Sequence, residues 1–146
     1  MKLPIIAAAL FALTFSTSAL SRDTKHLLPI DEAMNLPEAQ EKLDGSVKFY
    51  FADEGHPQVA QRIPGVVANR KTNAFMKSDE EACSWVFLSA MIALQDRAIR
   101  EGADAVVNIT SYYDKNIMSS RSEYECHAGA VMAGVALKGD VVKFAD

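Results

Sequence analysis

The spacing of apolar positions predicts one long helix over residues 79–101. No proline or glycine interrupts residues 79–100, and Gly102 supplies the usual terminator. Ser78 and Glu81 have the spacing of a capping box, in which each side chain satisfies the amide of the other residue. Two apolar stripes follow the helical repeat: Cys83, Phe87, Ala90, Met91, Leu94 and Ala98, and then Trp85, Leu88, Ile92 and Ile99. Because the helix is apolar nearly all round from Trp85 to Leu94, we expect it to be buried on several sides or to form a homo-oligomer.

Alternating and β-branched runs predict a small sheet of about four strands, near residues 46–51, 62–71, 104–112 and 123–137. Pro64 cannot donate to a sheet ladder, so the second of these strands is expected at an edge or is expected to begin there. The last strand is expected to turn at residues 138–140 before a short tail. The predicted fold class is α+β, with a single domain over residues 46–146 in which the long helix packs on the sheet.

Small residues dominate the last predicted strand. Alternation places one set on a single face, namely Cys126, Ala128, Ala130, Met132, Gly134 and Ala136. Small side chains let a helix approach closely, so we expect the helix to cross this face with Cys83 over Cys126. A disulfide between these two cysteines closes a loop of roughly 44 residues and stabilises the fold by roughly 4 kcal/mol in the chain-entropy account.

The first 21 residues have the layout of a secretory signal peptide. Lys2 precedes an uncharged run over residues 3–15, and the small-x-small rule permits cleavage after Ala19 or after Ser21. The run is shorter than the roughly 20 residues of a spanning helix, and neither cleavage site precedes a cysteine that could carry lipid. We therefore expect a periplasmic or secreted protein without stable membrane insertion after cleavage, a compartment in which paired cysteines usually form disulfides.

Residues 22–45 carry scattered charge in place of a long apolar period. Pro29, Pro37 and the Asp44-Gly45 turn signal interrupt them, and short helices are expected near residues 31–35 and 37–43. The sequence therefore predicts a surface arm or linker between the signal peptide and the domain.

The charge balance argues against two classes of binding partner. The chain has 15 Lys and Arg against 19 Asp and Glu, a formal net charge of -4 that becomes -5 once Lys2 is removed. Binding to nucleic acid or to an anionic membrane relies on dense Lys and Arg, so neither is expected. The loose group of Arg70, Lys71 and Lys77 is expected to be solvated.

A metal or redox site competes with the disulfide for the same residues. Cys83, Cys126, His127 and His56 would make a Cys2His2 set, although their spacing matches no paired-ligand motif. Neighbours in a strand project to opposite faces, so Cys126 and His127 are not expected to converge on one ion. We therefore predict no resident metal or cofactor and keep His127 and His56 only as candidate ligand-binding residues.

Motifs of the common enzyme classes are absent from the sequence. It lacks the GxSxG elbow, HExxH, GxGxxG and the phosphate-binding GxxxxGK[ST] loop. His56, Asp53 and Ser119 could serve hydrolase chemistry, but nothing in their spacing marks them as partners. The expected protein is not an enzyme.

Nearly the whole chain after the signal peptide resembles a family of small exported bacterial proteins of unknown function. The likeness is carried by the segments VKFYF, KTNAF, KSDEEACSWVFLSA, LQDRAIREGADAVVNITSYY and YECHAGAVMAGVALKGDVVK. Some members of that family are labelled "excinuclease ATPase subunit". The label implies Walker motifs and zinc modules, and this sequence has neither.

A more distant resemblance covers the C-terminal half. The segments GADAVVNI and ECHAGAVMAGVAL are similar to the core of RcsF, an outer-membrane lipoprotein that senses envelope stress, and of the pentamer-forming YbjQ proteins. The resemblance implies an RcsF/YbjQ-like fold in which Cys83 and Cys126 match one of two RcsF disulfides. Ser111 and Met132 then stand at the positions of the other, and the lipid-bearing cysteine is missing. Fold alone does not convey function.

Two functions are expected from these observations. The first is a non-enzymatic periplasmic module that interacts with, or helps to assemble, a protein partner of the cell envelope. The alternative is a metal or small-ligand binding protein.

Overall fold

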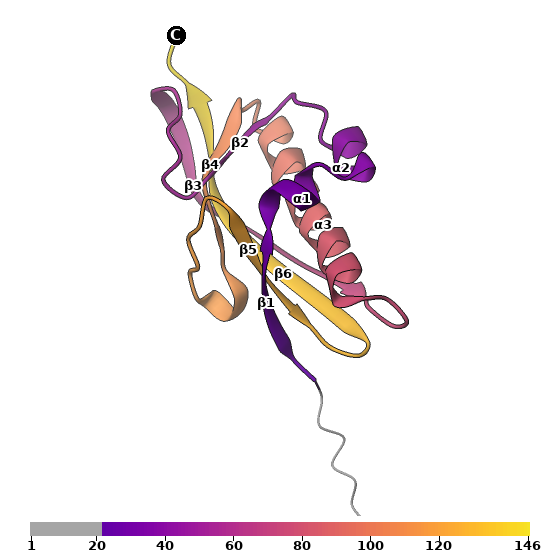
Figure 1. Ribbon diagram of the computed structural model, residues 1–146. Helices are drawn as coiled ribbons and strands as arrows, with labels where there is room; N and C mark the ends of the chain where they lie inside the picture. The colour runs from indigo at the N-terminus through magenta and orange to yellow at the C-terminus, as the bar shows by residue number, and fades with distance from the viewer. Residues whose placement is uncertain (1–21) are drawn as a thin grey trace, which may run out of the picture.

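The computed structural model describes residues 22–146, so the expected signal peptide lies outside the described residues. The elements in chain order are β1 (Thr24–Pro29), α1 (Ile30–Met34), α2 (Pro37–Lys42), β2 (Lys48–Phe51), β3 (Val59–Asn73), α3 (Asp79–Arg100), β4 (Ala105–Ser111), the 3-10 turn η1 (Tyr113–Lys115), β5 (Glu123–Ala128) and β6 (Met132–Phe144). Figure 1 shows α3 beside the sheet, with α1 and α2 against it. Within residues 22–146, no helix is long and apolar enough to cross a membrane.

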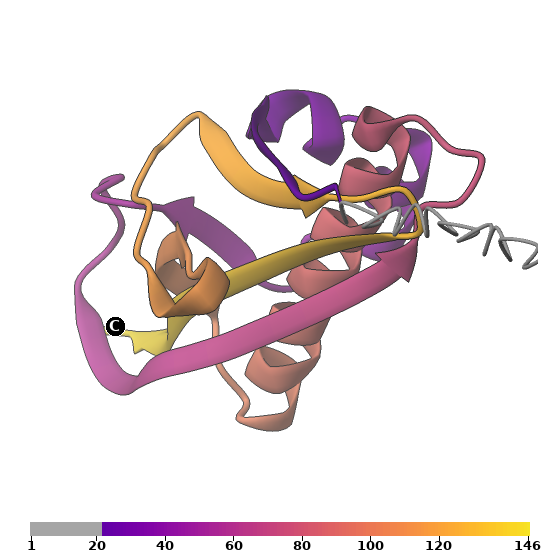
Figure 2. The same cartoon turned by 90° about the horizontal axis from the view of Figure 1, so that it is seen from below.

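Six strands form one sheet around β6. β3 pairs with β6 along one edge, while β5 and then β4 pair with its other edge. β1 continues the sheet beyond β5, to which it is antiparallel. β2 continues it beyond β4, to which it is parallel. Figure 2 shows β3 running beside β6 with α3 behind them. The α+β class with one long helix is confirmed, whereas the expected four strands are too few.

One of the additional strands, β1, lies in the segment that was expected to be a surface arm. It pairs antiparallel with β5, from Thr24 opposite Ala128 to Pro29 opposite Glu123. Its side chains alternate between half-buried and exposed, because one of its faces meets solvent. This half-polar pattern is too weak to stand out between charges and prolines. The two short helices expected in the same segment are confirmed as α1 and α2.

The other additional strand arises because the predicted strand 123–137 is two strands, β5 and β6, joined by residues 129–131. Ala128 pairs with Ala133, and the even number of residues between these two partners exchanges the parity of the faces. Ala133, Val135 and Leu137 therefore join the core under α3, whereas the expected Gly134 and Ala136 do not. Strict alternation holds only within one uninterrupted strand.

The expected turn at residues 138–140 is also wrong, because β6 continues to Phe144. Gly139 serves close approach there: a Cβ atom on it would lie 2.7 Å from Cγ1 of Val106. Pro64 lies in β3 as expected for an edge, since β3 pairs only with β6 among the described strands. It falls in a bulge where Gly65 has a φ of 66° and donates its amide to Asp140 Oδ1 at 3.0 Å.

Helix α3 provides most of the core on its sheet-facing side. The Ser78 hydroxyl accepts the Glu81 amide at 3.1 Å, which confirms the Ser78 half of the predicted capping box. Phe87 stacks on Tyr124 with ring centroids 4.1 Å apart, within a core that also contains Met91 and Leu94. Leu88, from the second apolar stripe, is buried as well.

The N-terminal segment covers much of the apolar surface of α3 that does not face the sheet. α1 contacts α3, and Ile30 and Ala33 of α1 are buried in the common core. The Gln95 amide donates to the Lys42 carbonyl at 3.0 Å, which ties the end of α2 to the same helix. Trp85 remains 48% exposed and Ile99 53% exposed. The chain thus covers much of the helix with its own N-terminal elements and leaves Trp85 at a surface.

Candidate functional site

Cys83 of α3 and Cys126 of β5 form the predicted disulfide. Their Cα atoms lie 5.9 Å apart, and both residues are fully buried. The bond anchors the beginning of α3 to the sheet. It also removes both thiolates from the hypothetical Cys2His2 set, since a metal requires free thiolate ligands.

A second attachment holds the beginning of α3 beside the disulfide. The Arg22 guanidinium donates two hydrogen bonds to Asp79, from Nη1 to Oδ2 at 2.7 Å and from Nη2 to Oδ1 at 2.8 Å. His26 Nε2 lies 2.8 Å from the same Oδ2. The bonds from Arg22, and next the bond from His26, hold the pKa of Asp79 well below its ordinary range. Sequence patterns missed this cluster because its members are 57 and 53 positions apart.

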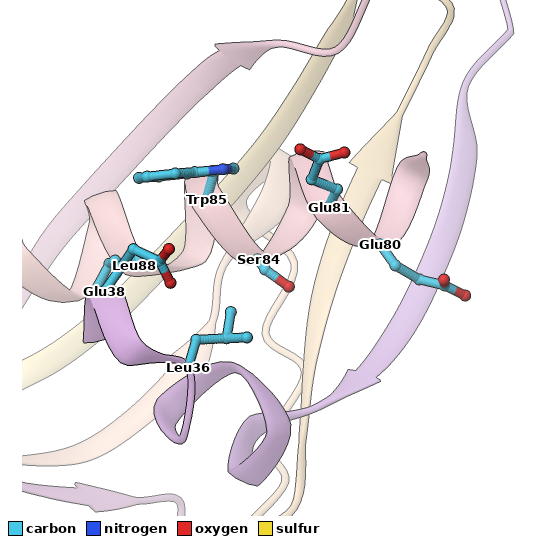
Figure 3. Close-up of a pocket in the computed structure, with 7 residues that line it drawn as sticks. All are labelled: Leu36, Glu38, Glu80, Glu81, Ser84, Trp85 and Leu88. Carbon is cyan, nitrogen blue, oxygen red and sulfur yellow. The ribbon is translucent and has the colours of Figure 1, made fainter. Parts of the chain in front are cut away.

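A groove lies between α3 and the connection from α1 to α2. Its volume is about 360 Å³, and seven residues line it: Leu36, Glu38, Glu80, Glu81, Ser84, Trp85 and Leu88. Figure 3 shows Leu36 pointing toward α3, Leu88 beside Glu38, and Trp85 on the same flank of the helix as Glu81. The groove therefore combines an apolar floor with a polar rim.

The rim of this groove is acidic. Glu38, Glu80 and Glu81 contribute three carboxylates, and no lysine or arginine is among the described lining residues. Burial raises the pKa of Tyr124 in the core to about 12, and Ser84 of the groove partly offsets this rise. An apolar pocket surrounded by carboxylates suits an occupant that is both hydrophobic and cationic.

His127 lies on the face of the sheet opposite α3. Its ring stacks on Tyr113 with centroids 3.6 Å apart, and its nitrogens face two carboxylates. Nε2 is 2.7 Å from Glu125 Oε2, and Nδ1 is 3.2 Å from Asp23 Oδ1. Burial, followed by the charges of Asp23, Asp114 and Glu125, raises the pKa of Tyr113. An adjoining hollow of about 590 Å³ is also lined by Lys71 and by residues 129–134.

His56 lies in a different part of the molecule. It follows β2, stacks on Phe144 at a centroid distance of 6.4 Å and makes an edge contact with Tyr50. Phe144 is ten residues along β6 from Gly134, the strand partner of His127. That span corresponds to roughly 30 Å. The structure does not bring the two candidate histidines together, and no group of three or more metal-ligating side chains is assembled within residues 22–146.

The scattered hydrolase residues are not joined either. Arg121 Nε donates to Asp53 Oδ1 at 2.7 Å, His56 Nδ1 faces the Pro57 carbonyl, and Ser119 lines a separate hollow near Lys138. No hydrogen bond links any two of Asp53, His56 and Ser119 in the described part of the chain.

Ser111 and Met132, which the resemblance to RcsF places at a second disulfide position, lie apart. Ser111 pairs with Leu137, five residues along β6 from Met132. Five strand residues span about 16 Å, well beyond the reach of a disulfide. The Ser111 hydroxyl instead accepts the Glu125 amide at 2.9 Å, which joins the end of β4 to β5.

Comparisons with known proteins found no matching family model, no matching curated protein and no matching solved structure.

Proposed function

We propose that this chain is an exported, non-enzymatic binding module of the bacterial cell envelope, periplasmic or secreted. Its docking surface is the groove between α3 and the α1–α2 connection. The observation that carries this proposal is the half-exposed Trp85 beside two leucines and three carboxylates. Tryptophan is enriched among the residues that dominate binding energies, because it buries a large area at a small entropic cost.

The chemistry of the groove defines the partner. Leu36, Trp85 and Leu88 favour an apolar side chain, and the surrounding carboxylates favour a neighbouring lysine or arginine. A volume of about 360 Å³ suits one or two side chains. The expected occupant is therefore a short protein segment in which an apolar residue stands next to a basic one.

The attachments of α3 suit this role. The disulfide at Cys83 and the ion pair between Arg22 and Asp79 hold the helix start, from which Glu80, Glu81 and Trp85 project. A docking surface that is already ordered loses little conformational entropy on binding.

The proposed location rests on two independent features. Residues 1–21 have the composition of a secretory signal. The buried disulfide is typical of proteins that reach an oxidising compartment. Retention of the precursor mass, with free thiols, in protein purified from its native host would contradict export.

The binding proposal can be tested through Trp85, the sole tryptophan in the sequence. A synthetic peptide that alternates leucine with lysine should shift its fluorescence to shorter wavelength in a saturable manner. A matched leucine–glutamate peptide should have no effect. Removing two rim charges with Glu38→Gln and Glu81→Gln should weaken binding at least fivefold, whereas the matched change Glu123→Gln, at the exposed first residue of β5, should leave it unchanged. Equal binding of both peptides, or of neither, would overturn the proposal.

A second candidate function is small-ligand or metal binding at the hollow beside His127. The observation that favours it is the stacked Tyr113–His127 pair at the wall of a 590 Å³ hollow. Native mass spectrometry of protein purified from the envelope provides the test. A stoichiometric bound mass that His127→Ala removes would establish this function, and a two-proton deficit without any bound species would contradict it.

A further inference from the structure

The loop between β3 and α3 exposes an apolar and basic segment, residues 75–77. Phe75 is 63% exposed and Met76 is 90% exposed, and Lys77 follows them. Met76 has a φ of 59°, in the left-handed region that such a side chain rarely adopts. Two large hydrophobic side chains in succession are thus presented to solvent by an unfavourable backbone conformation.

This loop is an ordered turn. The Phe75 amide donates to Asn73 Oδ1 at 2.8 Å, and the Lys77 amide donates to the Ala74 carbonyl at 3.1 Å. Ala74 is buried, and its amide donates to the Val131 carbonyl at 2.7 Å in the neighbouring hairpin. The exposed side chains therefore project from a fixed base, as expected of a segment prepared for a contact.

The loop and the acidic groove occupy the same end of α3. Ser78, which follows the loop, caps the helix, and Glu80, Glu81 and Trp85 line the groove within the next two turns. At 1.5 Å per residue, Trp85 lies about 10 Å along the helix from Ser78. Figure 1 shows the loop extending beyond this end of α3, and none of its residues lines the groove of its own chain.

We propose that two copies of this chain associate around a two-fold axis, with residues 75–77 of each copy in the Trp85 groove of the other. The proposal rests on the binding function of the groove and names its occupant. Phe75 and Met76 meet the apolar floor, where both the aromatic ring and the thioether pack favourably on tryptophan. Lys77 meets the acidic rim. Because the two patches adjoin, each contact is made twice and the assembly closes as a dimer.

The experiment follows mass and groove occupancy together in protein expressed from the full sequence. Sedimentation velocity over a concentration series should show a monomer–dimer equilibrium, and Trp85 emission should shift to shorter wavelength over the same range. The double change Phe75→Ser with Met76→Ser should raise the dissociation constant at least tenfold. Ile117→Ser, at a 64% exposed position in another loop, is the matched control and should not.

Charge reversal identifies the partner surfaces. Lys77→Glu should weaken the dimer at least fivefold, and combining it with Glu81→Lys in the same chain should restore association. Lys48→Glu, the same change at the exposed first residue of β2, should have no effect, and melting temperatures report whether each variant is folded. A protein that is monomeric at all concentrations, or a dimer unaffected by every loop variant, would overturn the proposal.

The two proposals fail separately. A peptide of residues 72–78 added to the Phe75→Ser, Met76→Ser variant should shift Trp85 emission if the loop binds the groove. If the leucine–lysine peptide shifts the emission while this peptide does not and the protein stays monomeric, groove binding stands and self-association is wrong. If neither peptide binds, both proposals are wrong.

Discussion

Cys83 near the start of α3 is bonded to Cys126 in β5, across a sequence separation of 43. Because the bond restricts the unfolded chain, replacing both cysteines by alanine should lower the free energy of unfolding by about 2–4 kcal/mol. The melting temperature should fall by roughly 10 °C. Calorimetry of the variant, and of the original protein under strong reductant, measures the effect. An unchanged melting temperature would mean that the thiols are unpaired.

Acid should weaken the attachment of β1 to α3. Arg22, and then His26, hold the pKa of Asp79 below its ordinary value of 3.8, so the carboxylate stabilises the fold above about pH 4. That stabilisation is lost as the pH falls further, because the unfolded chain takes up the proton first. Urea unfolding should therefore show a larger deficit for Asp79→Asn at pH 6 than at pH 2.5. Asp53→Asn, which breaks an exposed pair with Arg121, should change little at either pH.

Gly139 should not tolerate a methyl group. A Cβ there would lie 2.7 Å from Val106 Cγ1 and 3.2 Å from Ile109 Cγ1, inside the core. Gly139→Ala should therefore cost about 1–3 kcal/mol of unfolding free energy. Gly55→Ala is the matched control, since nothing lies within 4 Å of its added atom. Equal stability of the two variants in denaturant unfolding would refute the close approach.

The Ser111 hydroxyl should stabilise the fold through its hydrogen bond between β4 and β5. It accepts the Glu125 amide in a buried bond, so Ser111→Ala leaves that donor unsatisfied at a cost of about 1–3 kcal/mol. Hydrogen exchange at the Glu125 amide should accelerate in the variant. Ser119→Ala, in an exposed loop, should leave both stability and exchange unchanged.

Local signals predicted the elements that carry strong patterns. The cap at Ser78 and the uninterrupted run to Arg100 specified α3, and Pro64 indicated an edge strand. β1 was not predicted, because an edge strand with one solvated face has a weak pattern among charges and prolines. The turn predicted at residues 138–140 failed because Gly139 meets a packing requirement of Val106, which no local signal reports.

The sites, like the fold, could be predicted from the sequence only in part. The disulfide followed from two cysteines in a chain with an expected export signal, and the separation of His127 from Cys126 followed from strand alternation. The groove could not be predicted, because Leu36 and Trp85 are brought together only when the N-terminal elements fold against α3. Its one signal was the excess of apolar residues around the helix, which predicted either burial on several sides or contact with a second subunit.

Residue patterns alone predict the α+β class, the long capped helix and the cysteine pairing, because period, capping and composition act within short segments. Sheet order, the parity of β6, the attachment of β1 and the acidic groove depend on contacts between distant segments. Those contacts are set by which surfaces pack best once all elements compete for the same core, a property of the whole chain and of no single segment.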